Sequence, residues 1–139
     1  MNKTPVRRAL VVALLLVGCT SVGGGTNIET RLADDSITLS SAEVPAGKVT
    51  FDITNTAGQA HEVEVFSGAI PGQRPPVVNH VADTKGLSVV GEKEDILGGT
   101  NVKLTLDLEP GTYLVICNLP DHYQRGMVAE LTVTATPGT

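Results

Sequence analysis

The sequence predicts an all-β protein, a Greek-key β-sandwich or barrel of about seven or eight strands. Beyond Asn27, short runs of alternating apolar and polar residues are separated by Gly, Pro, Asn and Asp. Such runs are typical of strands joined by turns. No sustained period of 3.6 residues occurs there, so no long amphipathic helix is expected. Seven or so short strands in roughly 110 residues fit a sandwich or Greek-key barrel.

The predicted strands follow one another with turn residues between them. They cover residues 29–33, 36–40, 48–54, 61–66, 101–108, 111–117 and 127–134. Pro-Ala-Gly precedes the third strand and Glu-Pro-Gly precedes the sixth, and both triplets are turn formers. Residues 67–100 are predicted to be a long irregular segment with at most one or two short strands or a helical turn. A segment of that length indicates a functional or covering loop. His80, which lies in it, is expected to be exposed and to have no metal role.

Side-chain parity indicates which way several candidate residues point. His61 shares a strand face with two valines, while Glu62 and Glu64 take the opposite, solvated face. Met127 shares a face with the apolar residues of the last strand. Both His61 and Met127 are therefore expected to face the core. Cys117 ends a strand that is apolar on both faces, so parity indicates a central strand and does not decide its direction.

The first 27 residues have the layout of an export signal and a linker. A basic start is followed by an apolar run at 9–17, which predicts a signal peptide at 1–18. Leu-Val-Gly before Cys19 resembles the bacterial lipobox, and this resemblance implies cleavage before Cys19 and lipidation of its sulfur. The alternative is an ordinary secretory signal in which Cys19 is discarded or incidental. Residues 19–27 would then form the lipidated cysteine and a flexible linker, and 28–136 a single domain.

These features predict an exported, extracytoplasmic or periplasmic lipoprotein, held at a membrane by its lipid. Three of the ten Lys and Arg residues lie within 1–18, so the rest of the chain carries seven against 15 acidic residues, about −8. An acidic domain has no basic surface for nucleic acid. Its expected charged partners are basic proteins, and a monomer is expected.

The two cysteines of the chain have different expected fates. With Cys19 assigned to lipid, Cys117 has no disulfide partner in a compartment that oxidises thiols. It is then either a buried, inert residue or a metal ligand. His122 and Met127 follow it within eleven residues, and His61 is the fourth candidate. His61 alone would suit a satisfied strand-end histidine, and Met127 alone would suit core packing.

Together, these four residues predict one type 1 copper site. Two imidazoles, a thiolate and a more distant thioether are the ligand set of electron-transfer copper, trigonal in the first three with a weak axial fourth. The thiolate of Cys117 is soft and suits Cu(I), while imidazoles suit both oxidation states. Met127 as the weak axial ligand would help to tune the potential.

The chain also resembles the cupredoxins, the blue-copper family that includes plastocyanin, azurin and auracyanin. Asn-Thr-Ala-Gly-Gln-Ala-His-Glu at 55–62 resembles the family's first-ligand segment, and the Cys-x4-His-x4-Met spacing at 117–127 resembles its ligand loop. The resemblance covers nearly all of 28–136. It implies that His61, Cys117, His122 and Met127 bind copper. It also implies that the region of Asn55 donates hydrogen bonds near the cysteine sulfur.

The ligand loop departs from the family pattern at two positions. Asp121 stands where relatives often carry glycine, and Arg125 stands where a small residue is common. Because Asp tolerates unusual backbone angles better than most residues, the loop is expected to keep its conformation. Both residues place charge beside the expected exposed edge of the site.

The expected function is a membrane-tethered electron carrier that cycles Cu(II)/Cu(I) between redox proteins, such as a cytochrome or a membrane oxidoreductase. The alternative is a copper-binding carrier or storage protein without an electron-transfer role. An enzyme is not expected, because three histidines in all leave no second copper centre once two are used. A binuclear copper centre with two bridging thiolates would need a second cysteine.

Overall fold

The structure is a computed structural model, and it describes residues 24–138. The predicted signal peptide and the predicted lipidation at Cys19 lie outside the described residues. Within 24–138, no helix has the length and apolar character needed to cross a membrane.

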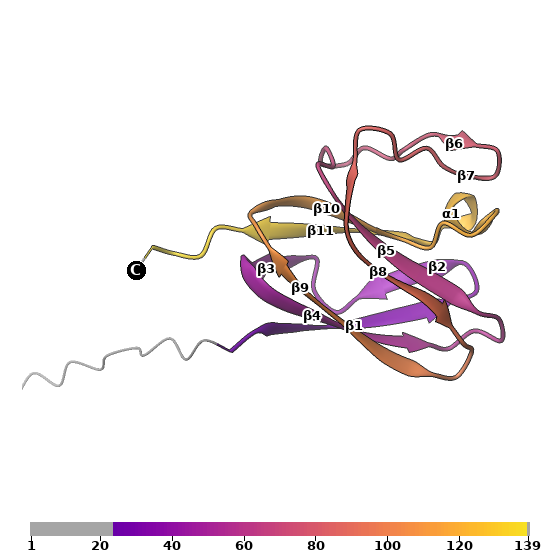
Figure 1. The fold of residues 1–139 in the computed structure, drawn as a ribbon, viewed down its shortest axis with the longest axis horizontal. Coiled ribbons are helices and arrows are strands. Elements are labelled where there is room, and N and C mark those ends of the chain that lie inside the picture. The colour runs from indigo at the N-terminus through magenta and orange to yellow at the C-terminus, as the bar shows by residue number, and fades with distance from the viewer. Residues whose placement is uncertain (1–23, 139) are drawn as a thin grey trace, which may run out of the picture.

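Two β-sheets face each other, which confirms the all-β sandwich (Figure 1). The first sheet has the order β2-β1-β4-β9, with β1 Thr26–Ala33, β2 Ser36–Leu39, β4 Gly47–Asn55 and β9 Asn101–Leu108. The second has the order β3-β11-β10-β5-β8, with β3 Glu43–Pro45, β5 His61–Ser67, β8 Ser88–Ile96, β10 Gly111–Ile116 and β11 Val128–Thr134. A two-stranded hairpin, β6 Val77–Val78 and β7 Val81–Ala82, and a short helix, α1 His122–Arg125, complete the described elements. The pairs β1/β4 and β3/β11 are parallel.

The core lies between the two sheets and is filled by the inward positions of the alternating strands. Val49, Phe51 and Ile53 on β4 are fully buried, as their spacing predicts. His61 is 1% exposed and Met127 is fully buried, so the inward direction predicted for both is confirmed. The sandwich therefore carries two of the four candidate ligands on its inner surface.

A second apolar cluster lies on the outer face of the second sheet. Leu114 and Ile116 of β10 point away from the main core, yet both are buried. They pack with Phe66, Ala82 and Tyr123. The cover comes from residues 68–87, called here the excursion, which leave β5, form the β6/β7 hairpin above α1 and return as β8 (Figure 1). This explains why β10 is apolar on both faces: it is a central strand, and both its faces are covered.

Three parts of the fold differ from the predicted elements. β8 is nine residues long and pairs with β5, although residues 67–100 were predicted to be largely irregular. It is an edge strand whose side chains are nearly all exposed, so it lacks the apolar alternation that predicts a strand. β3 is short and was not predicted. β1 begins at Thr26, which pairs with Val49, so the end of the predicted linker belongs to the domain.

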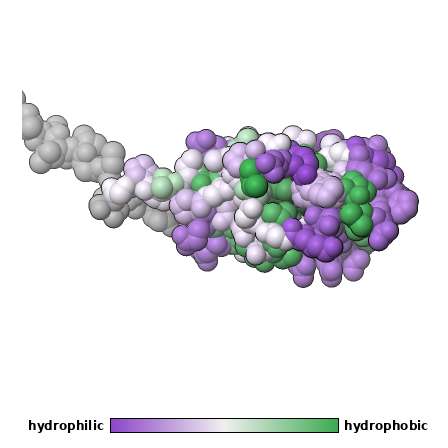
Figure 2. Space-filling view, turned by 90° about the horizontal axis from the view of Figure 1, so that it is seen from above, coloured by the Kyte–Doolittle hydropathy of each residue, from purple (hydrophilic) through white to green (hydrophobic). Residues whose placement is uncertain are grey.

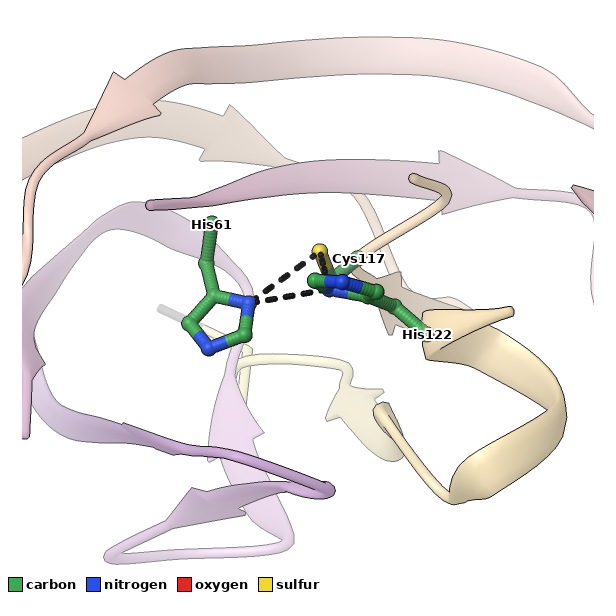
Figure 3. Close-up of side chains that lie close together, drawn as sticks. All are labelled: His61, Cys117 and His122. Atoms are coloured by element: carbon green, nitrogen blue, oxygen red, sulfur yellow. Dashed lines mark hydrogen bonds between the residues drawn. The ribbon is translucent and has the colours of Figure 1, made fainter. Parts of the chain in front are cut away.

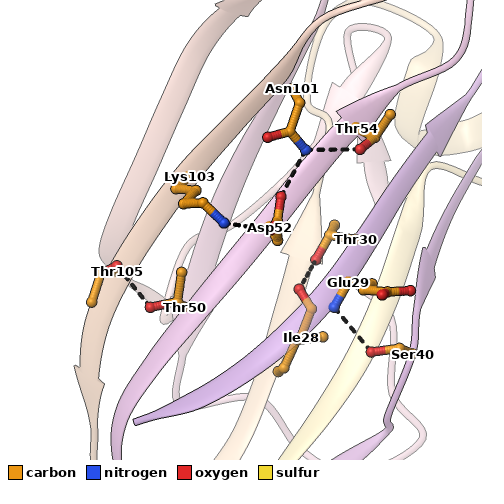
Figure 4. A network of polar contacts seen from close by, with 10 residues as sticks. All are labelled: Ile28, Glu29, Thr30, Ser40, Thr50, Asp52, Thr54, Asn101, Lys103 and Thr105. Atoms are coloured by element: carbon orange, nitrogen blue, oxygen red, sulfur yellow. Dashed lines mark hydrogen bonds and ion pairs between the residues drawn. The ribbon is translucent and has the colours of Figure 1, made fainter.

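The outer face of the first sheet is polar and solvated. Asp52 on β4 accepts a hydrogen bond from Asn101 at 2.7 Å and pairs with Lys103, both on β9 (Figure 4). These two contacts lower the pKa of the Asp52 carboxyl. Thr50 and Thr105 share a hydroxyl hydrogen bond of 2.9 Å across the same strand pair. This face has the composition of a solvated sheet surface.

The described chain termini and α1 lie at opposite ends of the sandwich (Figure 1). Figure 2 shows the molecule from the side of the excursion, where hydrophilic residues predominate toward the α1 end and apolar residues form small separate patches. Among the described residues, the exposed large apolar side chains are Ile70, Val77, Val78, Val89, Val90 and Leu97.

Candidate metal centre

The loop from Cys117 to Met127, called here the ligand loop, joins β10 to β11 at the α1 end of the sandwich. Its base is closed by backbone hydrogen bonds: the N–H of Cys117 donates to the carbonyl of Met127 at 3.1 Å, and the N–H of Met127 donates to the carbonyl of His122 at 3.1 Å. The two ends of the loop therefore continue the β10/β11 pairing. Cys117 and Met127 are held by the sheet itself.

The two unusual residues of the ligand loop fit its conformation. Asp121 has φ 69°, a left-handed conformation that Asp tolerates better than most residues. Gly126 has φ 126°, and a Cβ placed there would lie 2.7 Å from the carbonyl oxygen of Asp35. Arg125 forms an ion pair with Asp35 at 2.7 Å. The β1–β2 turn thus packs directly against the ligand loop.

His61 enters the site from the first position of β5, behind a loop that Asn55 holds. The buried Asn55 side chain donates to the carbonyls of Gln59 and Ile96, each at 2.8 Å, and accepts from the N–H of Ala57 at 2.9 Å. These bonds fix the turn that delivers His61 and join it to β8. Both amide donors of Asn55 are used in this way, and its backbone N–H donates to the carbonyl of Thr100, so the donors of Asn55 itself go to other groups than the cysteine sulfur.

The hydrogen bond to the sulfur comes from the residue after His61. The backbone N–H of Glu62 donates to Sγ of Cys117 at 3.5 Å, and the Glu62 carboxylate accepts from the N–H of Asn118 at 3.1 Å. Glu62 directly follows His61, and Asn118 directly follows Cys117. The hydrogen bond between them therefore joins the two chain segments that carry these donors. From strand parity, Glu62 was expected to lie on a solvated face. Its position directly after a candidate ligand was the signal that could have identified it.

His61, Cys117 and His122 converge in a buried cluster (Figure 3). The two histidine Nδ1 atoms lie 3.0 Å apart, and the sulfur lies 3.7 Å from Nδ1 of His61 and 3.4 Å from Nδ1 of His122. Bonds of about 2.0 Å from metal to nitrogen and about 2.3 Å from metal to sulfur are usual for these ligand types. All three separations are short enough for one ion to reach every atom. Among residues 24–138, this is the one group of His, Cys, Asp and Glu donors close enough to share a metal ion.

Burial sets the protonation of the three donors in the metal-free protein. It is the largest cause that lowers the pKa of both histidines, and it raises the pKa of the Cys117 thiol. Neutral imidazoles and a neutral thiol are therefore favoured. Neutral imidazole nitrogen is ready to bind a metal, whereas the thiol must release its proton as the metal binds. The Nε2 atom of His61 is buried and has no hydrogen-bond partner, so the ring's polar interactions are concentrated at the Nδ1 that faces the cluster.

The copper-free protein should lose stability as the pH falls below about 6.5. The ordinary histidine pKa of 6.5 is lowered in the fold for His61 and His122. The unfolded chain therefore takes up protons on them at a higher pH than the folded chain, and acid favours unfolding. The stability that the neutral rings contribute is fully present above 6.5 and is lost progressively below it.

Denaturant unfolding of the copper-free protein at about pH 7.5 and about pH 5.5 measures this effect, with a slope approaching 1.4 kcal/mol per pH unit for each histidine. The variant His61→Gln cannot take up a proton at that position and should show a smaller dependence. Glu62 and Glu64 titrate in the opposite sense, because burial raises the pKa of both carboxyls from 4.5. A free energy of unfolding that is higher at pH 5.5 in the natural sequence would contradict the prediction.

The other residues singled out from the sequence lie outside the trio. Met127 is fully buried, belongs to the same core cluster as Cys117 and is hydrogen-bonded through its backbone to both loop donors. His80 is exposed, with 71% of its side chain accessible, and its Nδ1 lies 2.7 Å from a carboxylate oxygen of Asp121. It is not part of the metal cluster. Its exposure is as predicted.

Comparison with known proteins agrees with this site. A family model for copper-binding proteins of the plastocyanin/azurin family matches residues 28–134. The solved structure of dithionite-reduced auracyanin from the photosynthetic bacterium Roseiflexus castenholzii has a TM-score of 0.58 and 22% identity, covering 81% of this chain and 98% of that one. This likeness shows a shared fold.

Two curated relatives are much longer proteins. The iron uptake system component EfeO of Yersinia pestis is 33% identical over 95 residues, which are 68% of this chain and 19% of that protein. The multicopper oxidase mco of Staphylococcus aureus is 27% identical over 116 residues, 73% of this chain and 25% of that protein. The chain thus spans a quarter or less of the length of these relatives.

The donor set, its burial and its spacing fit a single type 1 copper site, and the family model covers the sandwich and all its candidate ligands. The chain belongs to the plastocyanin/azurin family of copper-binding proteins, the cupredoxins.

Proposed function

We propose that the protein is an electron carrier, in which one copper ion held by His61, Cys117 and His122 alternates between Cu(II) and Cu(I). The observation that carries the proposal is the buried trio itself. His61 begins β5, Cys117 directly follows β10 and His122 begins α1, so the sandwich and the loop that it closes hold all three donors in place. A site that keeps one geometry in both oxidation states needs little rearrangement when an electron moves. Copper bound there would supply the one-electron chemistry.

Met127 is proposed as the weak axial ligand. It is fully buried, and its backbone contacts bring it beside Cys117 and His122. A thioether is a soft, neutral donor, and a distant axial thioether is typical of electron-transfer copper sites. In this role it would tune the potential more than it would determine whether copper binds.

Electrons are proposed to enter and leave beside His122. At 8% exposed, it is the most accessible of the three donors, whereas His61 is 1% exposed and Cys117 is fully buried. It lies at the α1 end of the sandwich, away from the start of β1 (Figure 1). If Cys19 carries a lipid, the site would therefore face away from the membrane, toward a redox protein such as a cytochrome or a membrane oxidoreductase.

Copper delivery is the second candidate, and the similarity to an iron uptake component supports some role in handling metals. The burial of the site favours electron transfer over delivery. Handing copper to an acceptor requires ligands to exchange one at a time at an accessible position, and the trio offers little access. An oxidase activity like that named for the S. aureus relative would need further copper centres. Within residues 24–138 the structure has a single donor cluster.

Copper titration of the purified protein tests the proposal. The oxidised protein should show an intense visible absorption band and a type 1 paramagnetic spectrum at one copper per chain. It should be reduced and reoxidised reversibly, and Cu(I) should pass to a competing chelator far more slowly than electrons exchange between molecules. Absence of the intense band would refute the copper site. An intense band with copper transfer faster than electron exchange would favour delivery.

The carboxylate of Glu62 should lower the reduction potential of bound copper. A negative charge held beside Cys117 by a hydrogen bond stabilises Cu(II) more than Cu(I), so Glu62→Gln should raise the reduction potential. A partly screened charge at this range contributes on the order of 1 kcal/mol, roughly 40 mV for one electron. The glutamine oxygen can still accept the hydrogen bond from Asn118, so the variant removes the charge and keeps this contact.

Voltammetry at about pH 8, where this carboxyl is ionised, measures the change. The control is Glu92→Gln, which makes the same substitution at an exposed position on β8. The control should shift the potential less. Equal shifts in the two variants would mean that the position of the Glu62 carboxylate beside Cys117 has no special influence on the reduction potential.

A further inference from the structure

The excursion contacts the ligand loop at a position next to Cys117. The side chain of Asn118 accepts a hydrogen bond from the N–H of Ala82 at 2.7 Å and donates to the carbonyl of Ala82 at 3.4 Å. Asn118 therefore docks on β7 through the same pair of backbone groups that a neighbouring strand would use. Because Asn118 directly follows Cys117, this contact restrains the chain at the sulfur donor.

Two further contacts lie on either side of His122. The N–H of Asp121 donates to the carbonyl of His80 at 2.8 Å, and the side chains of the same two residues meet at 2.7 Å. On the other side, the hydroxyl of Tyr123 donates to the carbonyl of Pro75 at 2.8 Å. The excursion thus holds the neighbours of both donors that the ligand loop supplies.

Tyr123 is the buried member of these contacts. It is 6% exposed and lies in the outer apolar cluster with Leu114 and Ile116, under the excursion. Burial raises the pKa of its phenol, so the hydroxyl is a neutral donor at physiological pH. A buried donor of this kind fixes both the ring and the backbone that carries it, because breaking its bond leaves a polar group without water.

We propose that the excursion is a clamp on the copper site, and that Tyr123 is a positioning residue that holds His122 in its ligand geometry. Tyr123 does not face the metal trio and acts through its neighbour in the chain. The inference concerns the conformation of the loop in the copper-free protein. Its redox consequences rest on the proposed electron-transfer function.

The chain contains a matched control for this test. Its only other tyrosine, Tyr113, is 5% exposed and also donates to a backbone carbonyl, that of Glu109, at 2.8 Å. That bond lies at the opposite end of β10 from the ligand loop. Tyr123→Phe and Tyr113→Phe each remove one buried hydroxyl and one hydrogen bond of equal length. Their effects on overall stability should be similar, whereas their effects on the site should differ.

Amide hydrogen exchange of the copper-free protein is the first readout. In Tyr123→Phe, exchange in residues 117–127 should accelerate about fivefold relative to the rest of the domain, the factor that a net hydrogen bond of about 1 kcal/mol implies. In Tyr113→Phe the ligand loop should exchange as in the natural sequence. Equal protection of the loop in the two variants would overturn the proposal. This measurement needs no copper, so it tests whether the excursion restrains the ligand loop even if the proposed function is wrong.

The copper-loaded variants give the second readout. Tyr123→Phe should alter the paramagnetic spectrum of Cu(II) and slow electron self-exchange by about threefold, because a looser loop rearranges more when copper changes oxidation state. Tyr113→Phe should alter neither. If the natural sequence shows no type 1 spectrum, the proposed function is refuted and the clamp is not. If the natural sequence shows that spectrum but Tyr123→Phe and Tyr113→Phe behave alike, the clamp is refuted and the proposed function is not.

If Tyr123→Phe does not fold, the variant His80→Ala tests whether the excursion restrains the ligand loop. The His80 side chain is exposed, so its loss leaves no buried cavity, and it removes the side-chain contact to Asp121 on the other side of His122. Faster exchange of the ligand loop in this variant would support the clamp. Unchanged exchange would overturn it.

Discussion

Cys117→Ser is expected to abolish the intense visible absorption of the oxidised copper protein. That absorption requires a thiolate bonded to Cu(II), and a serine hydroxyl supplies neither the soft sulfur nor the charge. The exchange is nearly isosteric at a fully buried position, so the sandwich should still fold. Visible spectra of the two proteins at equal copper loading, with bound copper measured independently, give the result.

Cys19→Ser is the control, because it makes the same exchange at the only other cysteine of the chain. It should leave the spectrum unchanged. If Cys19 is lipidated, it should also release the protein from membranes, so one variant tests the anchor and controls for the site. An intense band that persists in Cys117→Ser would refute the assignment of the thiolate.

Met127→Leu is expected to raise the reduction potential while copper stays bound. Removal of the axial thioether leaves three donors, and Cu(I) accepts this lower coordination number more readily than Cu(II) does. A change on the order of 1 to 2 kcal/mol corresponds to roughly 40 to 90 mV for one electron. Voltammetry and copper analysis of the same samples measure the potential and the occupancy together.

Leu131→Met is the matched control for that variant. It makes the reverse exchange on β11, at another fully buried position of the same core cluster, and swaps of this kind conserve volume and alter stability little. It should leave the potential unchanged. If Met127→Leu lost copper as readily as it shifted the potential, Met127 would be a principal ligand and its weak axial role would be wrong.

Most of the strands, and the direction of His61 and Met127 among the four candidate ligands, could be predicted from the sequence, because both follow from local rules. Successive side chains on a strand alternate between its faces, so the apolar spacing of β4 and β5 was enough to place His61 in the core. The Cys-x4-His-x4-Met spacing lies within one loop. Its donors could be recognised together without knowledge of the fold, and His61 was the one ligand that had to be sought elsewhere in the chain.

The features that the sequence did not reveal depend on contacts between distant segments. β8 has few inward apolar residues, since an edge strand is held by its backbone pairing with β5 and needs no buried face. The hydrogen bond to the sulfur comes from Glu62 and not from Asn55, because which of them reaches the sulfur depends on the path of the turn before β5. The residue pattern of a single segment does not predict the path that a turn takes in the folded chain.

By itself, the sequence determined the all-β class, the inward direction of His61 and Met127, and a thiol, imidazole and thioether set suited to copper. The tertiary structure decided what holds that set in place. It brings the β1–β2 turn against Gly126, straps Glu62 to Asn118 and lays the excursion over the ligand loop. The physical reason is the range of the interactions: ligand identity and strand parity are properties of neighbouring residues, whereas the restraint of the site comes from hydrogen bonds and packing between segments that only the folded chain brings together.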